Sequence, residues 1–224
     1  MVPLVVLPTL NEAATVAGII ARVCAALPTA AVLVVDDASE DGTASIAEAA
    51  GVNVMRRTGE RGLGHAYRAG FAWALERGHD PIYQMDADGS HDPADLPRLV
   101  GSDLVLGSRW IPGGGTRRWG ATRQALSRFG SAYSRGLLGL PYRDITGGFK
   151  CWSAALLAQV APASTIASGY AFQVEMTLRA HRLGASILEV PIVFSERELG
   201  VSKMSLSIAI EAARLVPGMR KVGR

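Results

Sequence analysis

Two carboxylates separated by one residue are the first feature of this sequence that could do chemistry. Asp86 and Asp88 follow an apolar run at residues 81–85, in the segment Met85-Asp-Ala-Asp-Gly-Ser-His91. Side chains at positions i and i+2 of an extended chain point to one side, so two hard oxygen ligands converge there. Such a pair suits Mg²⁺ or Mn²⁺, with water and phosphate oxygens in the remaining positions. The alternative is a solvated turn in which Asp88 caps a helix.

A second acidic pair favours the metal. Asp36 and Asp37 end another apolar run, at residues 31–35, and we expect both runs to end at the same edge of one sheet. Crowded carboxylates repel each other unless a cation compensates them. A nucleotide offers ribose hydroxyls and base hydrogen-bond donors, and carboxylates outside the metal shell, such as Asp37 and Glu12, could accept from both.

The elements that must position these residues alternate along the chain. Expected strands are residues 2–7, 31–35, 52–55, 81–85 and 103–106, and expected helices are residues 16–27, 41–50 and 64–75. This alternation predicts an α/β fold with a Rossmann-like, mostly parallel sheet and helices on both faces. The polar residues follow strand ends, where open α/β sheets bind ligands. No glycine-rich dinucleotide motif or P-loop follows the first strand, so neither of those sites is supported.

Composition indicates one cytoplasmic domain. With 224 residues, 49% of them hydrophobic, and no linker-like stretch, we expect a single domain over residues 1–224. No run reaches the roughly 18 apolar residues of a membrane-spanning helix, and the apolar start meets Pro8 too soon for a signal peptide. Cys24 and Cys151 are interpreted as reduced packing residues.

The net charge of +3 is mild, but arginines gather between Arg109 and Arg143. Arginine suits bidentate contacts with phosphate. The basic residues lack the interleaved aromatics of a base-stacking surface, so we expect no nucleic-acid partner. The alternative is a solvated basic face. The glycines at 113–115 favour a mobile basic segment, which would suit a lipid phosphate arriving from a membrane.

The C-terminal segment, residues 198–224, has two interpretations. It places Leu206, Ile210, Ala213 and Val216 on one helix face, and basic residues crowd its end. It could be a core-packing helix with a solubilising tail, or an amphipathic helix on the cytosolic surface of an anionic membrane. A separate membrane protein could also anchor the chain through these apolar residues.

Ordered motifs over nearly the whole chain resemble family 2 glycosyltransferases of the dolichol- or polyprenol-phosphate mannose synthase type, the bacterial polyprenol-phosphate form most of all. The motifs are Pro8-Thr-Leu-Asn-Glu12, Val35-Asp-Asp37 with Asp41-Gly-Thr43, Met85-Asp-Ala-Asp-Gly-Ser-His91, Gly107-Ser-Arg109, Asp144-Ile-Thr-Gly-Gly-Phe149, Gly169-Tyr-Ala-Phe-Gln-Val-Glu175, Glu189-Val-Pro-Ile-Val-Phe-Ser-Glu-Arg197 and Gly200-Val-Ser-Lys-Met204.

This resemblance implies a GT-A type fold and inverting transfer of mannose from GDP-mannose to a polyprenyl phosphate. It implies a metal site at Asp86, Asp88 and Ser90, although some relatives have Gln in place of Ser90. Arg109 and Arg123 would hold the acceptor phosphate and, with Asp88, form the catalytic set. The implied nucleotide-sugar site comprises Pro8, Leu10, Glu12, Val35, Asp37, Ala87, Arg197 and Lys203. Many relatives have an aromatic residue at position 10, so a UDP donor of glucose or an aminosugar is the alternative.

The residues also fit this chemistry on physical grounds. A divalent cation with Arg197 and Lys203 could stabilise the charge that develops on a diphosphate leaving group. A lipid phosphate is already ionised near neutral pH, so it needs no general base. We therefore interpret His65 and His91 as local hydrogen-bonding residues, and Glu175 as a partner of a nearby arginine. A catalytically silent sugar-nucleotide binding module would not need the leaving-group donors.

Overall fold

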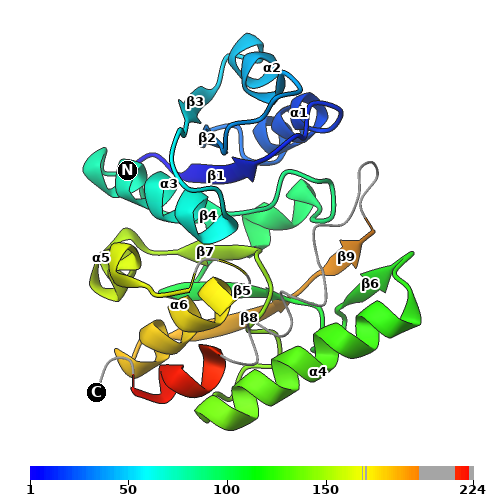
Figure 1. Cartoon of the computed structure of the whole chain (residues 1–224), viewed down its shortest axis with the longest axis vertical. Coiled ribbons are helices and arrows are strands. Elements are labelled where there is room, and N and C mark those ends of the chain that lie inside the picture. The colour runs from blue at the N-terminus through cyan, green and yellow to red at the C-terminus, as the bar shows by residue number, and fades with distance from the viewer. Residues whose placement is uncertain (168, 170, 197–214, 222–224) are drawn as a thin grey trace.

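A computed structural model of the chain describes residues 1–167, 169, 171–196 and 215–221. A seven-stranded sheet runs through the molecule in the order β3-β2-β1-β4-β7-β5-β8 (Figure 1). Its strands are β1 (Leu4–Thr9), β2 (Ala31–Asp36), β3 (Asn53–Arg56), β4 (Ile82–Gln84), β5 (Leu104–Ser108), β7 (Lys150–Trp152) and β8 (Ile187–Pro191). Only β7 runs antiparallel to its neighbours, β4 and β5, so the mostly parallel sheet is confirmed.

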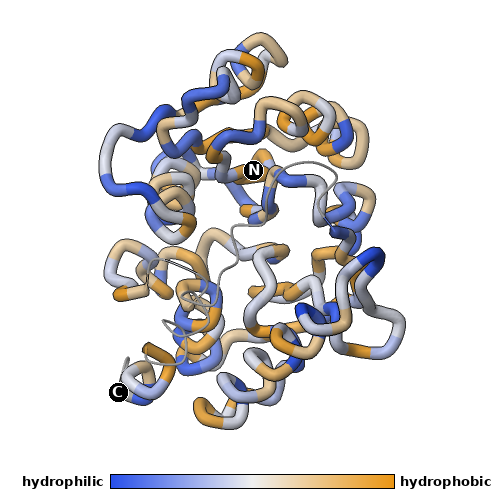
Figure 2. Tube along the Cα trace, turned by 45° about the vertical axis from the view of Figure 1, so that its right-hand side comes forward, coloured by the Kyte–Doolittle hydropathy of each residue, from blue (hydrophilic) through white to orange (hydrophobic). Residues whose placement is uncertain are grey.

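Helices cover both faces of this sheet. One face carries α1 (Val16–Ala26), α2 (Thr43–Ala49) and the 3₁₀ helix η1 (Pro93–Arg98); the other carries α3 (Leu63–Glu76), α5 (Ala154–Val160) and α6 (Ala171–Arg182). Residues of β1 alternate between the two layers, because Leu4 and Val6 join one buried cluster while Val5 and Leu7 join the other. Both polar and apolar residues occur along the helices, as expected when one side of a helix covers a sheet (Figure 2).

Helix α3 lies unusually close to the sheet. A Cβ atom at Gly70 would come within 2.6 Å of Val6 Cγ1 and 3.1 Å of Val35 Cγ2. Only glycine allows this approach without displacing a strand residue. Because α3 packs this closely against β1 and β2, it also holds Tyr67, one turn earlier on the helix, at a fixed distance from the sheet.

The strands and helices expected from the sequence are all present, with ends that move by one or two residues. The structure adds β7 and β8, and a small second sheet in which β6 (Gly115–Arg117) pairs in parallel with β9 (Val193–Ser195). All of these added strands lie beyond residue 110 in the sequence. The second half of the chain is therefore where the sequence pattern was least informative.

Most of the basic segment that was expected to be mobile forms regular secondary structure, and its mobility stays a prediction. Residues Ala121–Leu138 form α4, the helix at the lower edge of the molecule in Figure 1. Gly114 serves a close approach, because a Cβ there would come within 2.5 Å of the backbone oxygen of Ser108. Gly115 begins β6. Arg117 therefore lies on a strand, and Arg123, Arg128 and Arg135 lie on a helix.

Most of the predicted C-terminal tail, 198–224, lies outside the described residues. Its described part, residues 215–221, packs against the rest of the molecule beside α4 and α6 (Figure 1). Val216 and Met219 are buried in the core, Arg182 Nη1 donates to the Met219 oxygen at 3.2 Å, and Arg220 Nε donates to the Leu137 oxygen at 2.9 Å. Among the described residues, none of the helices has the length and apolar character needed to cross a membrane.

Candidate active site at the carboxyl edge of the sheet

The ends of β1, β2 and β4 meet at one edge of the sheet, as the sequence predicted. Thr9, the last residue of β1, donates its hydroxyl hydrogen to Asp36 Oδ1 at 3.0 Å, and the Asp37 amide donates to the Thr9 oxygen at 2.9 Å. Met85, directly after β4, donates its amide to the Val6 oxygen at 3.2 Å. The parallel register therefore brings both acidic pairs to the same edge.

Side chains join the loops after β1 and β2 to each other. Thr43 Oγ1 accepts from the Glu12 amide at 2.9 Å, and Asp41 Oδ2 accepts from the Ala13 amide at 2.9 Å. Burial alone would raise the pKa of Asp41, but hydrogen bonds from Thr43 and from backbone amides lower it overall. Thr15 donates to the Ala87 oxygen at 3.0 Å. The segment that carries Glu12 is thereby tied to the segment that carries Asp86 and Asp88.

Asp37 is buried and holds the loop between β3 and α3. Its carboxylate forms an ion pair with Arg57 and accepts from the Gly62 amide at 2.6 Å, while Arg57 Nη2 donates to the Glu60 oxygen at 3.0 Å. Sequence reasoning assigned Asp37 to a nucleotide and missed Arg57. A carboxylate has about four lone-pair sites, so these bonds are compatible with a further hydroxyl donor.

Asp86 lies between the hydroxyl of Tyr67 and the backbone of Gly148. Tyr67 donates to Asp86 Oδ1 at 3.1 Å, and a Cβ at Gly148 would come within 3.2 Å of Oδ2 and 3.3 Å of Oδ1. Burial and the neighbouring charge of Asp86 raise the pKa of Tyr67 well above its ordinary value, so its hydroxyl stays protonated. A glycine at 148 leaves space beside a carboxylate that remains 28% exposed.

Asp88 is buried and bound by Ser90. The backbone amide of Ser90 donates to Asp88 Oδ1 at 3.0 Å, and its hydroxyl donates to the same oxygen. Within the described residues, no group of three or more His, Cys, Asp or Glu side chains could hold a metal by itself. Asp86 and Asp88 nevertheless fit a divalent cation, because Mg²⁺ and similar ions commonly take one or two carboxylates and complete their shell with phosphate and water.

His91 is a packing residue. Its ring stacks on Phe149 at 4.9 Å between centroids and meets the ring of Phe194 edge-on at 5.2 Å. Burial lowers its pKa, against the opposing effect of Asp86 and Asp88, so the ring is neutral near pH 7. The Asp86 amide also donates to His91 Nδ1 at 3.4 Å, so the prediction that His91 is a local hydrogen-bonding residue is confirmed.

Arg109 has a buried partner that sequence reasoning missed. Its Nε and Nη2 atoms lie 2.6 Å and 2.8 Å from the two carboxylate oxygens of Asp144. The guanidinium is also surrounded by the rings of Trp110, Trp119 and Phe194, with its carbon 5.2–5.7 Å from their centroids. Burial would raise the pKa of Asp144, but Arg109 lowers it overall. Asp144 opens one of the family-like motifs, which was its only signal in the sequence.

Arg123 is the more accessible of the two arginines expected to bind phosphate. It projects from α4, and its Nη1 lies 3.0 Å from Glu196 Oε1. Its side chain is 33% exposed, against 8% for that of Arg109. Arg197 and Lys203, expected at the diphosphate, lie outside the described residues.

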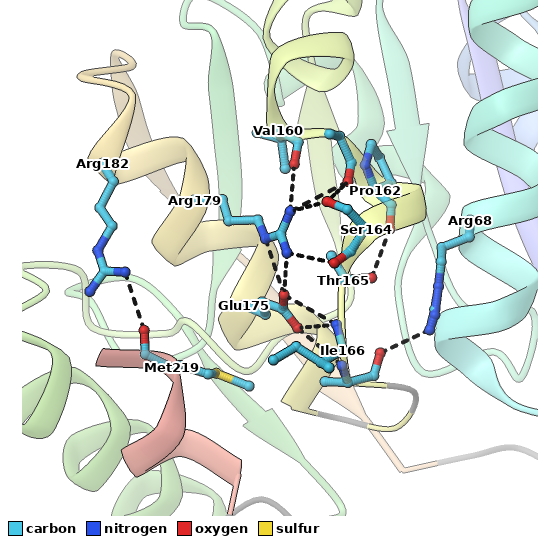
Figure 3. Close-up of polar contacts among 12 residues, drawn as sticks. Arg68, Val160, Pro162, Ser164, Thr165, Ile166, Glu175, Arg179, Arg182 and Met219 are labelled. Atoms are coloured by element: carbon cyan, nitrogen blue, oxygen red, sulfur yellow. Dashed lines mark hydrogen bonds and ion pairs between the residues drawn. The ribbon is translucent and has the colours of Figure 1, made fainter. Parts of the chain in front are cut away.

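Glu175 pairs with Arg179, as the sequence predicted. Figure 3 shows Arg179 reaching from α6 to this carboxylate and to the turn at Ser164, with distances of 2.7 Å from Nη2 to Glu175 Oε1 and 2.8 Å from Nη2 to the Ser164 oxygen. Glu175 Oε2 also accepts from the amides of Ile166 and Ala167, each at 3.0 Å. The pair therefore fixes the loop that leads into α6.

Known proteins that match this chain in sequence are glycosyltransferases. The family model described as glycosyl transferase family 2 matches residues 4–158. The chain is 46% identical over 220 residues to polyprenol monophosphomannose synthase of Mycolicibacterium smegmatis, covering 93% of this chain and 83% of that protein. It is 48% identical over 218 residues to undecaprenyl-phosphate mannosyltransferase of Micrococcus luteus, covering 93% and 90% respectively.

Solved structures support the fold. Glucosyl-3-phosphoglycerate synthase from Mycobacterium tuberculosis, in complex with phosphoglyceric acid, superimposes with a TM-score of 0.74 at 21% identity, covering all of this chain and 81% of that one. The same enzyme with Mn²⁺, UDP and phosphoglyceric acid also gives a TM-score of 0.74. The GT-A architecture is thus confirmed. The chain belongs to glycosyltransferase family 2.

Proposed function

We propose that the protein transfers mannose from GDP-mannose to a polyprenyl phosphate, with inversion, to give polyprenyl-phosphate mannose. The observation that carries this proposal is the identity of 46% and 48% to a polyprenol monophosphomannose synthase and an undecaprenyl-phosphate mannosyltransferase, each over 93% of the chain. The carboxylates of Asp86 and Asp88 at the carboxyl edge of the sheet, with Gly148 packed beside that of Asp86, support it further.

In this proposal Asp86 and Asp88 hold Mg²⁺ or Mn²⁺. A divalent cation neutralises charge on the diphosphate leaving group, which lowers the barrier to breaking the sugar–phosphate bond. Ser90 orients Asp88 through its two hydrogen bonds, and its hydroxyl is the third ligand. The presence of Mn²⁺ with UDP in a structural neighbour of the same architecture is consistent with this assignment.

The ends of β1 and β2, together with the loops after β1, β2 and β4, bind the nucleotide. We assign this role to Pro8, Leu10, Glu12, Val35, Asp37 and Ala87. The hydrogen bonds that join these three loops hold them in a fixed relation before the donor binds, which reduces the entropy lost on binding. Arg197 and Lys203 are assigned to the diphosphate on the resemblance alone.

The acceptor is an ionised phosphate, so the proposed reaction needs no general base. Arg123, a partly exposed side chain of α4, meets the phosphate, and Arg109 supports it from its buried ion pair with Asp144. The role of these residues is to align an anion for attack. Alignment of two reactants accounts for a large part of the rate enhancement in such transfers.

We further propose that α4 rests on the cytosolic surface of a membrane. Leu126, Phe129 and Tyr133 recur at helical spacing on its exposed side, and Phe129 is 68% exposed. Arg128, also exposed, adds attraction to anionic lipid. Flotation with anionic vesicles tests this point: Phe129→Ser should shift protein to the soluble fraction, and equal flotation of both proteins would contradict it. If neither protein floats, a separate membrane protein is the remaining anchor.

The experiment that tests the function is transfer of labelled sugar into extractable polyprenyl phosphate. GDP-mannose, UDP-glucose and UDP-N-acetylglucosamine are compared, with Mn²⁺, Mg²⁺ or a chelator. We expect transfer from GDP-mannose alone, lost with chelator and in Asp88→Ala. Transfer from a UDP donor would correct the donor, and tight nucleotide binding without any transfer would support a silent binding module.

A further inference from the structure

Tyr67 lies directly beneath the proposed metal carboxylate. It is fully buried on α3, with Phe71 and Phe172 stacked against it at centroid distances of 5.6 Å and 6.2 Å. The stacked rings hold the phenol in one orientation, and its hydroxyl donates to Asp86 Oδ1 at 3.1 Å. A rigid donor of this kind controls which way a carboxylate faces.

The chemistry of the two groups fixes the direction of that donation. An ionised carboxylate can only accept a hydrogen bond, so the hydrogen of the Tyr67 hydroxyl is directed to Asp86 Oδ1. The phenol ring cannot swing away from this acceptor, because the rings of Phe71 and Phe172 lie against it in the buried layer.

We propose that Tyr67 is a positioning residue for metal binding: held by the stacked rings of Phe71 and Phe172, it orients the carboxylate of Asp86 so that the carboxylate faces the cation. The inference rests on the proposed function, because it requires Asp86 to be a metal ligand. Hydrogen bonds to metal ligands restrict ligand orientation, and their loss typically weakens metal affinity about 10–100-fold.

The test is a titration of the whole protein with Mn²⁺ in the presence of GDP, followed by electron paramagnetic resonance of the free ion. Tyr67→Phe removes one oxygen from a buried ring, and we expect its Mn²⁺ affinity to fall about tenfold or more. Sugar transfer should fall at limiting Mn²⁺ and recover at saturating Mn²⁺. A purely structural defect would not be corrected by added metal.

Tyr83→Phe is the matched control. Tyr83 is on β4 and is also buried, but its side chain packs on the opposite face of the sheet from Tyr67. We expect wild-type Mn²⁺ affinity from this variant. If Tyr83→Phe weakens Mn²⁺ binding as much as Tyr67→Phe does, the positioning role of Tyr67 is overturned, because loss of any buried hydroxyl would then suffice.

Two further variants separate the inference from the proposed function. Phe172→Leu removes one of the rings stacked on Tyr67 while leaving its hydroxyl in place, so it should weaken Mn²⁺ binding in the same direction by a smaller factor; it also serves if Tyr67→Phe does not fold. Asp86→Asn should weaken binding most. If Asp86→Asn binds Mn²⁺ like the wild type, the metal site itself is wrong. If only Asp86→Asn is impaired, the metal site stands and the inference fails.

Discussion

Arg109 and Asp144 meet through two nearly parallel hydrogen bonds, of 2.6 Å and 2.8 Å, in a position where both side chains are buried. The Arg109 amide also donates to Asp144 Oδ2 at 2.9 Å. The ion pair joins the end of β5 to the segment before β7. Its removal should therefore affect both the fold and the acceptor side of the site.

The first prediction concerns this pair. Asp144→Ala leaves the Arg109 guanidinium buried without its counter-ion, and we expect a loss of about 3–5 kcal/mol in the free energy of unfolding, measured by urea titration. Glu48→Ala is the control, because its ion pair with Arg56 is exposed and should contribute almost nothing to stability. Similar losses in the two variants would contradict the structural role of Asp144.

The second prediction concerns pH. Burial lowers the pKa of Lys150 from 10.5 to about 7, so between those values the unfolded chain binds a proton that the native chain lacks. The free energy of unfolding should therefore rise with pH across this window because of Lys150. Lys150→Met should remove this contribution. Subtracting the variant's pH profile from that of the wild type cancels the opposing effect of Cys151, whose pKa is raised to about 12 and which both proteins contain. A flat difference profile would count against the shift.

The third prediction concerns the space beside Asp86. Gly148→Ala would place a methyl group within 3.2–3.3 Å of the carboxylate oxygens and push Asp86 aside. Contacts of this length require a shift of a few tenths of an ångström, whereas displacements near 1 Å in a site can cost about 100-fold in rate, so we expect a smaller loss, roughly tenfold, in sugar transfer. Gly136→Ala on α4, where an added Cβ meets nothing within 4 Å, should keep full activity. Wild-type rates in both variants would show that Asp86 can move without cost.

The fourth prediction concerns the loop before α6. Glu175→Gln removes the charge that holds Arg179 and weakens acceptance from the Ile166 and Ala167 amides, at a cost of about 1–3 kcal/mol in stability. Hydrogen exchange should accelerate at those two amides first. Gln159→Ala, which removes only a weak bond within α5, is the comparison. Unchanged protection in Glu175→Gln would mean that the loop is held by other contacts.

The first half of the fold could be predicted because each element shows its burial in its own residues. Val16, Ile19, Ile20 and Val23 form an apolar stripe on α1, and β1 and β2 are continuous apolar runs. Strand β7 gave no such signal. It has three residues and begins with Lys150, and only its position between β4 and β5 makes it a strand. Tertiary context determined this element, and local sequence could not show it.

The candidate site likewise contains residues that the sequence could single out and residues that it could not. Asp86 and Asp88 were found because strand-end position and spacing are local properties. Asp144 was missed as a partner of Arg109 because the two residues are 35 positions apart and nothing in a single sequence pairs them. Gly114, before α4, was interpreted as a sign of mobility, but a requirement for close approach to Ser108 looks the same in sequence as a requirement for flexibility.

The antiparallel direction of β7 affects which part of the chain can vary in length. The chain leaves the sheet at the carboxyl end of β5 and, because β7 runs the opposite way, re-enters the sheet at the same edge. Everything between Arg109 and Phe149, including α4 and β6, is therefore an excursion that starts and finishes at the edge where β1, β2 and β4 end. None of the seven strands of the main sheet lies inside it, so its length can change without shifting the register of that sheet. Its two ends are fixed, because Arg109 pairs with Asp144 and Gly148 packs beside Asp86.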